Sequence, residues 1–278
     1  MKRICLIGLI AMAIGLIAGS SVRAQDSSDK PITVSFSDPS RPGTVHVGLM
    51  QGGITVKAYN GKDVVIQTKS RPSSSRTRER APAESQGLHR LDAVSNGLRV
   101  EEENNVMTIG ASMTSFMDVE LQVPTKTNLK LSTLNGGDIV IEGVDGDIEV
   151  NNNNGKATLT DVAGSVVAHS LNGKVLATLK RVTAGKPMSF TSLNGDVDVT
   201  LPTDVKANVK LRTDNGDVYT DFDVQIKAGS APVIEDTRKN GGHYRIERDR
   251  SVLGAINGGG PDFELRTMNG NVYIRKAK

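Results

Sequence analysis

A short phrase that recurs through the middle of the chain is the feature that most limits its fold. Glycines fall at positions 136, 146, 155, 164 and 173, at spacings of 10, 9, 9 and 9 residues. Asn-Gly pairs place glycines at 136, 155, 173, 195 and 216, at spacings of 19, 18, 22 and 21 residues. A half-repeat of about ten residues is therefore nested in a repeat of about twenty, which is typical of a repeat architecture.

The residues after these glycines alternate between apolar and polar side chains. Ile139 and Ile141 follow one turn, and Val197, Val199 and Leu201 follow another. Period-two alternation in short runs between Gly and Asn indicates half-buried β-strands. Because β-branched residues and Gly interrupt every apolar face of helical period, we expect an all-β chain with no long helix.

Two all-β topologies place Asn-Gly between strands. A hairpin meander does so because a type I′ turn requires positive φ at both central residues. A parallel β-solenoid, either a β-helix or a β-roll, does so because equivalent residues stack from coil to coil. Every strand here follows its turn in the same register and after the same Ser/Thr-x pair, which favours the solenoid. We expect coils of about 18–22 residues with Asn-Gly turns, and either handedness remains open.

The repeat divides the rest of the chain. We expect one solenoid domain over residues 43–278, with a lead-in over 25–42. Residues 70–86 are rich in Ser, Pro and Arg and offer almost nothing to bury, which predicts a disordered or mobile loop. Residues 225–261 separate the last two Asn-Gly coils and predict an inserted hairpin or a longer excursion.

The segment 1–24 has the features of a secretory signal peptide. Lys2 and Arg3 precede an apolar run of about fifteen residues, and a Val-x-Ala sequence ends at Ala24. The run is shorter than the ~20 residues that a membrane-spanning helix needs, so cleavage is favoured over a retained anchor. We expect an exported protein in the periplasm, on the outer surface or outside the cell, with no transmembrane span after leader removal.

Composition excludes several kinds of function. The chain has 34 Lys and Arg against 31 Asp and Glu, and three of the basic residues lie in the leader. The remaining chain is formally neutral, which argues against a nucleic-acid partner because such a partner requires a clustered basic excess. Cys5 is the only cysteine, so the mature chain would have no disulfide, thiolate metal site or cysteine nucleophile.

The phrases at Leu193–Pro202, Leu211–Phe222 and Gly258–Ile274 resemble the bacterial "putative adhesin" repeat family. The resemblance covers roughly Gly43–Arg275 and is strongest over Val119–Phe222. It implies a β-solenoid fold in an exported or envelope-facing domain of unknown function, and it brings no catalytic residues. The motifs are turn and strand signatures, so they are specific to the fold rather than to an activity.

An Asn-Gly column is the most regular polar feature of the sequence. We expect a structural role, because Asn tolerates the left-handed conformation before Gly and its amide can hydrogen-bond from coil to coil. A row of amides that binds a ligand is the alternative. The predicted turn ladder consists of Asn135, Gly136, Asn154, Gly155, Asn172, Gly173, Asn194, Gly195, Asn215, Gly216, Asn269 and Gly270.

Acidic residues near the turns invite a calcium hypothesis. Asp138, Asp147, Asp196 and Asp217 follow turns, but lysines occupy other equivalent positions and the Gly-Gly-x-Gly-x-Asp repeat of calcium-binding β-rolls is not matched. We therefore expect solvated turn residues, no metal and no cofactor. An isolated cation site at Asp145 and Asp147 is the alternative.

Neither the histidines nor the arginines make a recognisable site. The histidines lack metal-ligand spacing and are His46, His89, His169 and His243. The arginines in and near the first excursion are Arg71, Arg76, Arg78, Arg80 and Arg90. Contact of these arginines with an acidic glycan or lipid head group is one interpretation, and a solvated loop is the expected one because glutamates offset the charge.

These features predict a non-enzymatic exported repeat protein, a cell-surface or envelope scaffold for adhesion or binding whose unknown ligand is a glycan or a protein. The alternative is a β-helix enzyme that cleaves polysaccharide with carboxylates on adjacent coils, for example Asp196 and Asp217. Tyr219 and Tyr273 alone share a phase on strand faces, and the chain has no Trp for sugar stacking. A regulatory envelope protein that binds a membrane-bound partner is a third possibility.

Overall fold

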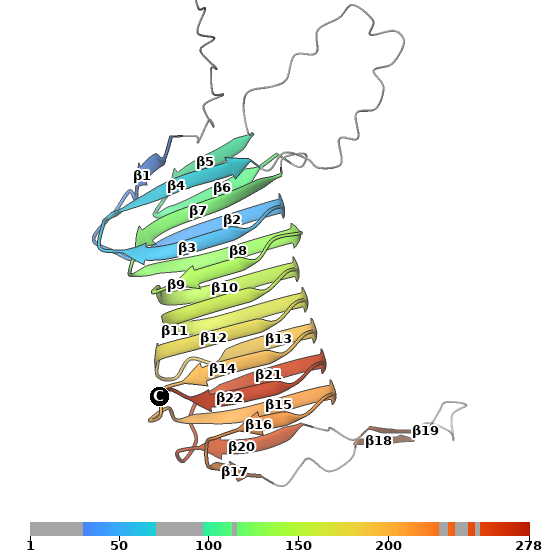
Figure 1. The fold of residues 1–278 in the computed structure, drawn as a ribbon. Helices are drawn as coiled ribbons and strands as arrows, with labels where there is room; N and C mark the ends of the chain where they lie inside the picture. The colour runs from blue at the N-terminus through green and yellow to red at the C-terminus, as the bar shows by residue number, and fades with distance from the viewer. Residues whose placement is uncertain (1–29, 71–96, 113–115, 228–232, 237–243, 248–250) are drawn as a thin grey trace, which may run out of the picture.

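The computed structural model describes residues 30–70, 97–112, 116–227, 233–236, 244–247 and 251–278. Every regular element in these ranges is a β-strand, which confirms the predicted all-β class (Figure 1). No helix within the described ranges is long and apolar enough to cross a membrane. The predicted leader, most of the 70–86 loop with its arginines, His89, His243 and parts of 225–261 lie outside them.

Most strands belong to two rows that run the length of the molecule (Figure 1). The first row contains β2 (Gly43–Gln51), β6 (Val106–Ala111), β8 (Thr127–Asn135), β10 (Asp145–Asn154), the second part of β11 (Ala157–Asn172), β13 (Met188–Asn194), β15 (Ala207–Asn215) and β21 (Asp262–Asn269). The second row contains β3 (Ile54–Tyr59), β7 (Met117–Pro124), β9 (Ile139–Glu142), the first part of β11, β12 (Val175–Val182), β14 (Val197–Leu201), β16 (Val218–Thr220) and β22 (Val272–Lys276).

Neighbouring strands within each row pair in parallel, and we call one strand of each row together a layer. Inward residues line up from layer to layer because the pairing register is maintained: Val150 pairs with Ala168, which pairs with Phe190, which pairs with Leu265. Alternate residues of both rows are buried in one apolar cluster. The period-two pattern of the sequence thus becomes a core between two rows of outward-facing polar positions.

The layers are not stacked in chain order. The β2–β3 layer lies between β6–β7 and β8–β9, and the β21–β22 layer lies between β13–β14 and β15–β16 (Figure 1). Both ends of the stack therefore contain a layer that the chain enters from a distant part of its sequence.

The ends of the stack are antiparallel, so the sheet is mixed rather than wholly parallel as predicted. At one end are β1 (Ile32–Ser35), β4 (Asp63–Ser70) and β5 (Leu98–Glu103), and at the other are β17 (Val224–Ile226) and β20 (Val252–Ile256). The physical reason is the edge: a stack of repeats exposes unpaired backbone at each end, and short reversed strands cover part of it. A separate antiparallel pair, β18 (Val233–Asp236) and β19 (Tyr244–Glu247), lies within the 225–261 excursion.

Candidate functional site

The six asparagines of the predicted turn ladder stand in one hydrogen-bonded row. Asn154 Nδ2 donates to Asn135 Oδ1 at 3.3 Å, and Asn172 Nδ2 donates to Asn154 Oδ1 at 2.9 Å. Bonds of 2.7, 2.7 and 2.8 Å continue the row in the order Asn172, Asn194, Asn269, Asn215. We call this row the amide ladder. Its order follows the stack and not the chain.

The backbone of the amide ladder differs from the sequence-based expectation. The non-glycine residues of the described chain with positive φ are Asn104, Asn105, Asp161 and Asn257. No ladder asparagine is among them, so the predicted left-handed asparagine is wrong. The asparagines are extended members of their strands, and their role comes from the amide.

Close contact between layers leaves no room for a Cβ after five of the six ladder asparagines; the exception is Gly136, which has open space around it and a φ of +75°. A Cβ on Gly173 would lie 2.0 Å from the carbonyl oxygen of Gly155. Gly173 has no positive φ, so space rather than backbone conformation explains it. A side chain here would force neighbouring layers apart at this edge.

A second polar column lies two residues before the amide ladder and faces inward. Its side chains donate to the carbonyl of a turn glycine in the preceding layer, as Ser170 Oγ does to Gly155 at 3.0 Å. The equivalent donors are Thr133, Asn152, Ser192, Thr213 and Thr267. Asn152 Oδ1 is buried without a hydrogen-bond partner. The Ser or Thr hydroxyl of the Ser/Thr-x pair thus forms a hydrogen bond between neighbouring layers.

Beside the amide ladder, an apolar row lies on the outer side of the first row of strands. Each member immediately precedes a ladder position: Met50, Leu134, Leu171, Leu193 and Met268. Met50, Leu134 and Met268 are 38%, 37% and 43% exposed. We call this set the aliphatic row. Sequence analysis missed it, although the outward phase of Leu in Leu-Asn-Gly could have revealed it.

A shallow hollow of about 510 Å³ lies further along the same face. Its lining includes His46, Lys130 and the exposed Val167, together with Asp147. Lys186 Nζ donates to both carboxylate oxygens of Asp147 at 2.7 Å, and this hydrogen bond lowers the pKa of Asp147. The lining therefore combines charged side chains with an exposed valine.

The aspartates considered for calcium mostly bond to the stack itself. Asp138 Oδ1 accepts from the backbone N–H of Lys156 at 2.8 Å, and Asp196 Oδ1 accepts from that of Asn271 at 3.0 Å. That backbone bond and a hydrogen bond from Lys174 lower the pKa of Asp196. Asp145, which was considered with Asp147 for an isolated cation site, forms an ion pair with Arg181. No group of three or more metal-ligating side chains occurs in the described ranges.

The carboxylate pair suggested for glycan cleavage is not on adjacent layers. Asn271, which directly precedes β22, lies between the two aspartates: its N–H donates to Asp196, and its Oδ1 accepts from the N–H of Asp217 at 2.9 Å. The expectation of adjacent coils is therefore wrong for Asp196 and Asp217. It followed chain order, and the inserted β21–β22 layer separates them.

Two histidines lie in the described ranges. His46 lines the hollow, and His169 Nδ1 lies 2.8 Å from Thr191 Oγ1 on the next strand of the same face. They are on different strands, three layers apart, and the structure does not bring them together. His169 is held by its hydroxyl neighbour.

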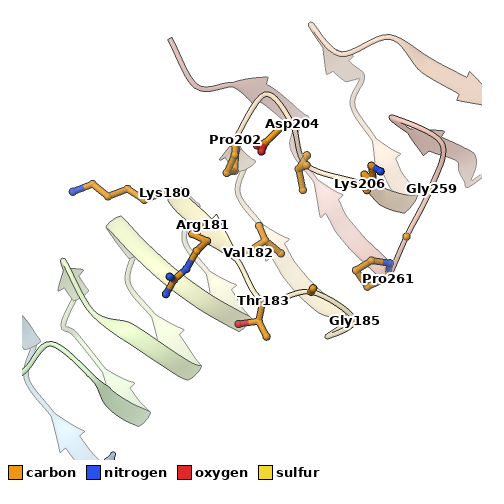
Figure 2. A pocket seen from close by; sticks show the side chains of 13 residues that line it. Lys180, Arg181, Val182, Thr183, Gly185, Pro202, Asp204, Lys206, Gly259 and Pro261 are labelled. Atoms are coloured by element: carbon orange, nitrogen blue, oxygen red, sulfur yellow. The ribbon is translucent and has the colours of Figure 1, made fainter.

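A corner cavity of about 440 Å³ lies where the loops at 183–187, 202–206 and 257–261 meet (Figure 2). Figure 2 shows the side chains of Lys180 and Arg181 directed away from these loops. Both cations are paired with earlier layers, Lys180 with Asp161 at 3.2 Å and Arg181 with Asp145 at 2.6 Å. The cavity therefore lies between longer corner loops. Two of the cations that line it, Lys180 and Arg181, are already ion-paired.

Comparison with known proteins identifies the family. No curated protein matches the chain. A "putative cell adhesion protein" from Clostridium sporogenes is 12% identical, with a TM-score of 0.40, over 89% of this chain and 99% of that one. A "putative adhesin" from Bacteroides fragilis is 13% identical, with a TM-score of 0.31, over 90% and 98%. The family model described as Toastrack DUF4097 matches residues 20–275, and the chain belongs to this family.

Proposed function

We propose that this chain is an exported, non-enzymatic β-solenoid that binds an envelope or cell-surface ligand through its first row of strands. The observation that carries the proposal is the aliphatic row beside the amide ladder. Leu and Met occupy five of the positions that precede the amide ladder, with Asn153 between Leu134 and Leu171, on an outer face where single exposed apolar residues would be ordinary. Several apolar side chains gathered along one edge of a face are typical of an interaction surface.

The amide ladder supports this proposal because it makes the face rigid before any ligand arrives. Each internal asparagine both donates and accepts a hydrogen bond, and the inward Ser/Thr column bonds the same edge to the next layer. A surface that is already ordered loses little conformational freedom on binding. The aliphatic row is thus held at the strand spacing of about 4.8 Å.

The charge of the chain predicts how such binding responds to salt. Basic and acidic residues balance outside the leader, and the aliphatic row carries no charge. Binding through apolar contacts and amides is weakly screened, whereas binding through exposed charges is lost as ionic strength rises. We therefore expect retention on envelope material to change by less than about threefold between low and high salt.

A double variant in the aliphatic row and a single control variant on the second row of strands test the proposed binding face. Leu171→Ser with Leu193→Ser places hydroxyls in the centre of the aliphatic row, and Leu176→Ser makes the same change on the opposite face as a control. We expect the double variant to lose retention on cell-envelope fractions and on a glycan array by about tenfold or more, with Leu176→Ser unchanged. Equal retention of wild type and double variant would contradict the proposal, and so would release of shortened glycans.

Export is part of the same proposal and has its own test. The leader at 1–24 predicts that cells which express the full chain release a product beginning at residue 25 into the periplasm or the medium. Cell fractionation with N-terminal sequencing measures this. An uncleaved chain in the cytoplasm would contradict export while leaving the binding face to its separate test.

A further inference from the structure

The two tyrosines that share a phase in the sequence lie side by side at the C-terminal end of the stack. Tyr219 of β16 pairs in register with Tyr273 of β22, and their ring centroids are 5.2 Å apart with an interplanar angle of 12°. Within the described ranges, β16 pairs with β22 alone. One face of the Tyr219 ring therefore lies against Tyr273, while the other is turned to the end of the stack.

Neighbouring side chains hold both rings in place. The guanidinium carbon of Arg275 lies 4.9 Å from the Tyr273 ring centroid, and Arg275 Nε donates to Asp198 Oδ1 at 2.8 Å. Asn271 Nδ2 donates to the Tyr273 hydroxyl at 3.0 Å. The Tyr219 hydroxyl donates to Asp217 Oδ2 at 3.3 Å. Tyr219 is nevertheless 48% exposed, so an ordered aromatic ring faces solvent.

Asp217 provides a hydrogen-bond acceptor beside the exposed ring, and Asp221 lies two residues after Tyr219 in the chain. Asp217 uses its backbone N–H and one carboxylate oxygen within the stack, which leaves acceptor positions on the carboxylate for an incoming donor. Asp221 is exposed, and one of its oxygens accepts from the N–H of Lys276 at 2.7 Å. Lys276 Nζ lies 5.4 Å from the Phe222 ring centroid. Acceptors of this kind suit hydroxyl donors.

The local charges nearly cancel, which bears on the kind of ligand. Asp198, Asp217 and Asp221 are acidic, Arg275 and Lys276 are basic, and Arg275 is paired with Asp198. With little net charge, the site distinguishes ligands by its ring face and by its hydroxyl acceptors. A pyranose ring offers the matching groups, because it has an apolar C–H face for the aromatic quadrupole and hydroxyls around its rim.

We propose that Tyr219 is a stacking platform for one pyranose ring of a neutral glycan, with Asp217 accepting a hydroxyl of the same sugar. The inference rests on the proposed binding function and adds a ligand class and a second contact at the end of the stack. The amide ladder and aliphatic row lie on the first row of strands, whereas Tyr219 lies on the second. The two contacts can therefore be removed independently.

The chain provides its own optical reporter. It has no Trp and four Tyr, two of which form the platform, so titration of the purified chain with neutral oligosaccharides should change the tyrosine emission. The panel contains cellobiose, maltotriose, chitobiose and galactobiose. Saturation-transfer NMR, which observes sugar C–H protons near the protein, gives a readout that does not depend on Tyr219 fluorescence. We expect saturable binding of at least one member, with transfer strongest to one face of the ring.

Substitutions separate stacking from folding. Tyr219→Ala should weaken sugar binding by about tenfold or more, whereas Tyr219→Phe, which retains the ring, should bind within about threefold of wild type. Ile32→Ala, a change at a similarly exposed apolar position of β1 at the other end of the stack, serves as the control and should bind as wild type. Circular dichroism melts of each variant check that the stack remains folded.

Several outcomes would overturn the proposal. They are wild-type sugar binding by Tyr219→Ala, no saturation transfer to any sugar of the panel, or saturation by tetramethylammonium in place of every neutral sugar. Envelope retention distinguishes this failure from failure of the proposed function. If wild type is retained on envelope fractions and Tyr219→Ala is retained equally, the platform alone is excluded; if wild type is not retained at all, the binding function fails.

Discussion

The two residues of the Asn-Gly pairs have different structural roles. The asparagine is required for its amide, which bonds to the layers on both sides, as Asn172 does with Asn154 and Asn194. Except at Gly136, the glycine is required for space, because a Cβ, for example on Gly173, would collide with a carbonyl oxygen of the neighbouring layer. The pair that indicates a tight turn in a hairpin thus serves close stacking here.

Asn152 is a member of the inward polar column with a buried acceptor that lacks a hydrogen-bond partner. Its Nδ2 donates to Gly137 O, but its buried Oδ1 has no partner. Thr133 and Thr267 hold equivalent positions with a hydroxyl. Asn152→Thr should keep the bond to the glycine carbonyl and remove the orphan acceptor, so the free energy of unfolding should rise by about 1 kcal/mol.

Chemical denaturation measures the effect of Asn152→Thr, and Ser170→Ala is its control. That variant removes a satisfied donor from the same column, so it should lower the free energy of unfolding by about 1 kcal/mol. A destabilised Asn152→Thr chain would show that the second bond of Asn152, to Lys156 O, matters more than the unpaired oxygen. Lys156 O retains the N–H of Ile139 in either case.

Asp196 links acidity to the stability of the last layers. Hydrogen bonds from the backbone N–H of Asn271 and from Lys174 lower its pKa below the ordinary 3.8. Because the folded pKa is the lower one, the stabilisation is fully present above about pH 4 and is lost as pH falls through the folded pKa. We expect the melting temperature of wild type to fall in that window, and that of Asp196→Asn to fall less. Parallel melting curves for the two chains would contradict this link.

At the scale of elements, the β21–β22 layer lies between the β13–β14 layer and the β15–β16 layer, which would be neighbours if the layers followed chain order. Its two strands pair with β13 and β15 on one row and with β14 and β16 on the other. Its inward side chains Phe263, Leu265, Val272 and Ile274 are all buried. The last strands of the chain therefore occupy an internal layer, and the β15–β16 layer depends on them.

Truncation after Pro261 tests this dependence. Loss of four buried side chains, at about 1.5–3 kcal/mol each, should lower the stability of this region by about 6 kcal/mol or more. Hydrogen exchange should then show loss of protection in β13–β16, far beyond the new end of the chain. Replacement of residues 233–247 by a short Gly-Ser linker is the control, since β18 and β19 pair only with each other. Protection retained in β15 after truncation would exclude the internal role.

At the scale of the whole molecule, two outer faces carry different chemistry on one core. The first row of strands presents the aliphatic row, the amide ladder and the hollow around Val167. The second presents charged and hydroxyl side chains and ends in the stacked tyrosines. Because outward side chains do not enter the core that the two rows share, a change on one surface leaves the packing of the other unchanged. This separation makes the matched surface controls possible.

Much of the candidate site could be predicted because it depends on local period. Outward and inward positions follow from alternation, and the predicted asparagines lie in one hydrogen-bonded row, although their expected backbone conformation was wrong. The phase that Tyr219 and Tyr273 share was also visible. Their contact was not, because no local pattern states which layer lies next to which.

The sequence by itself determined the strands, their inward faces and the stacked Asn-Gly edge, since side-chain alternation and glycine spacing act within about twenty residues. Only the tertiary structure decided the order of the layers and the reversal of strands at both ends. The repeats resemble one another closely, so the same register rule allows β14 to pair with either β16 or β22. In the folded chain β14 pairs with β22, whose inward side chains are buried in the core. This arrangement places β22 between Asp196 and Asp217 and brings Tyr273 against Tyr219.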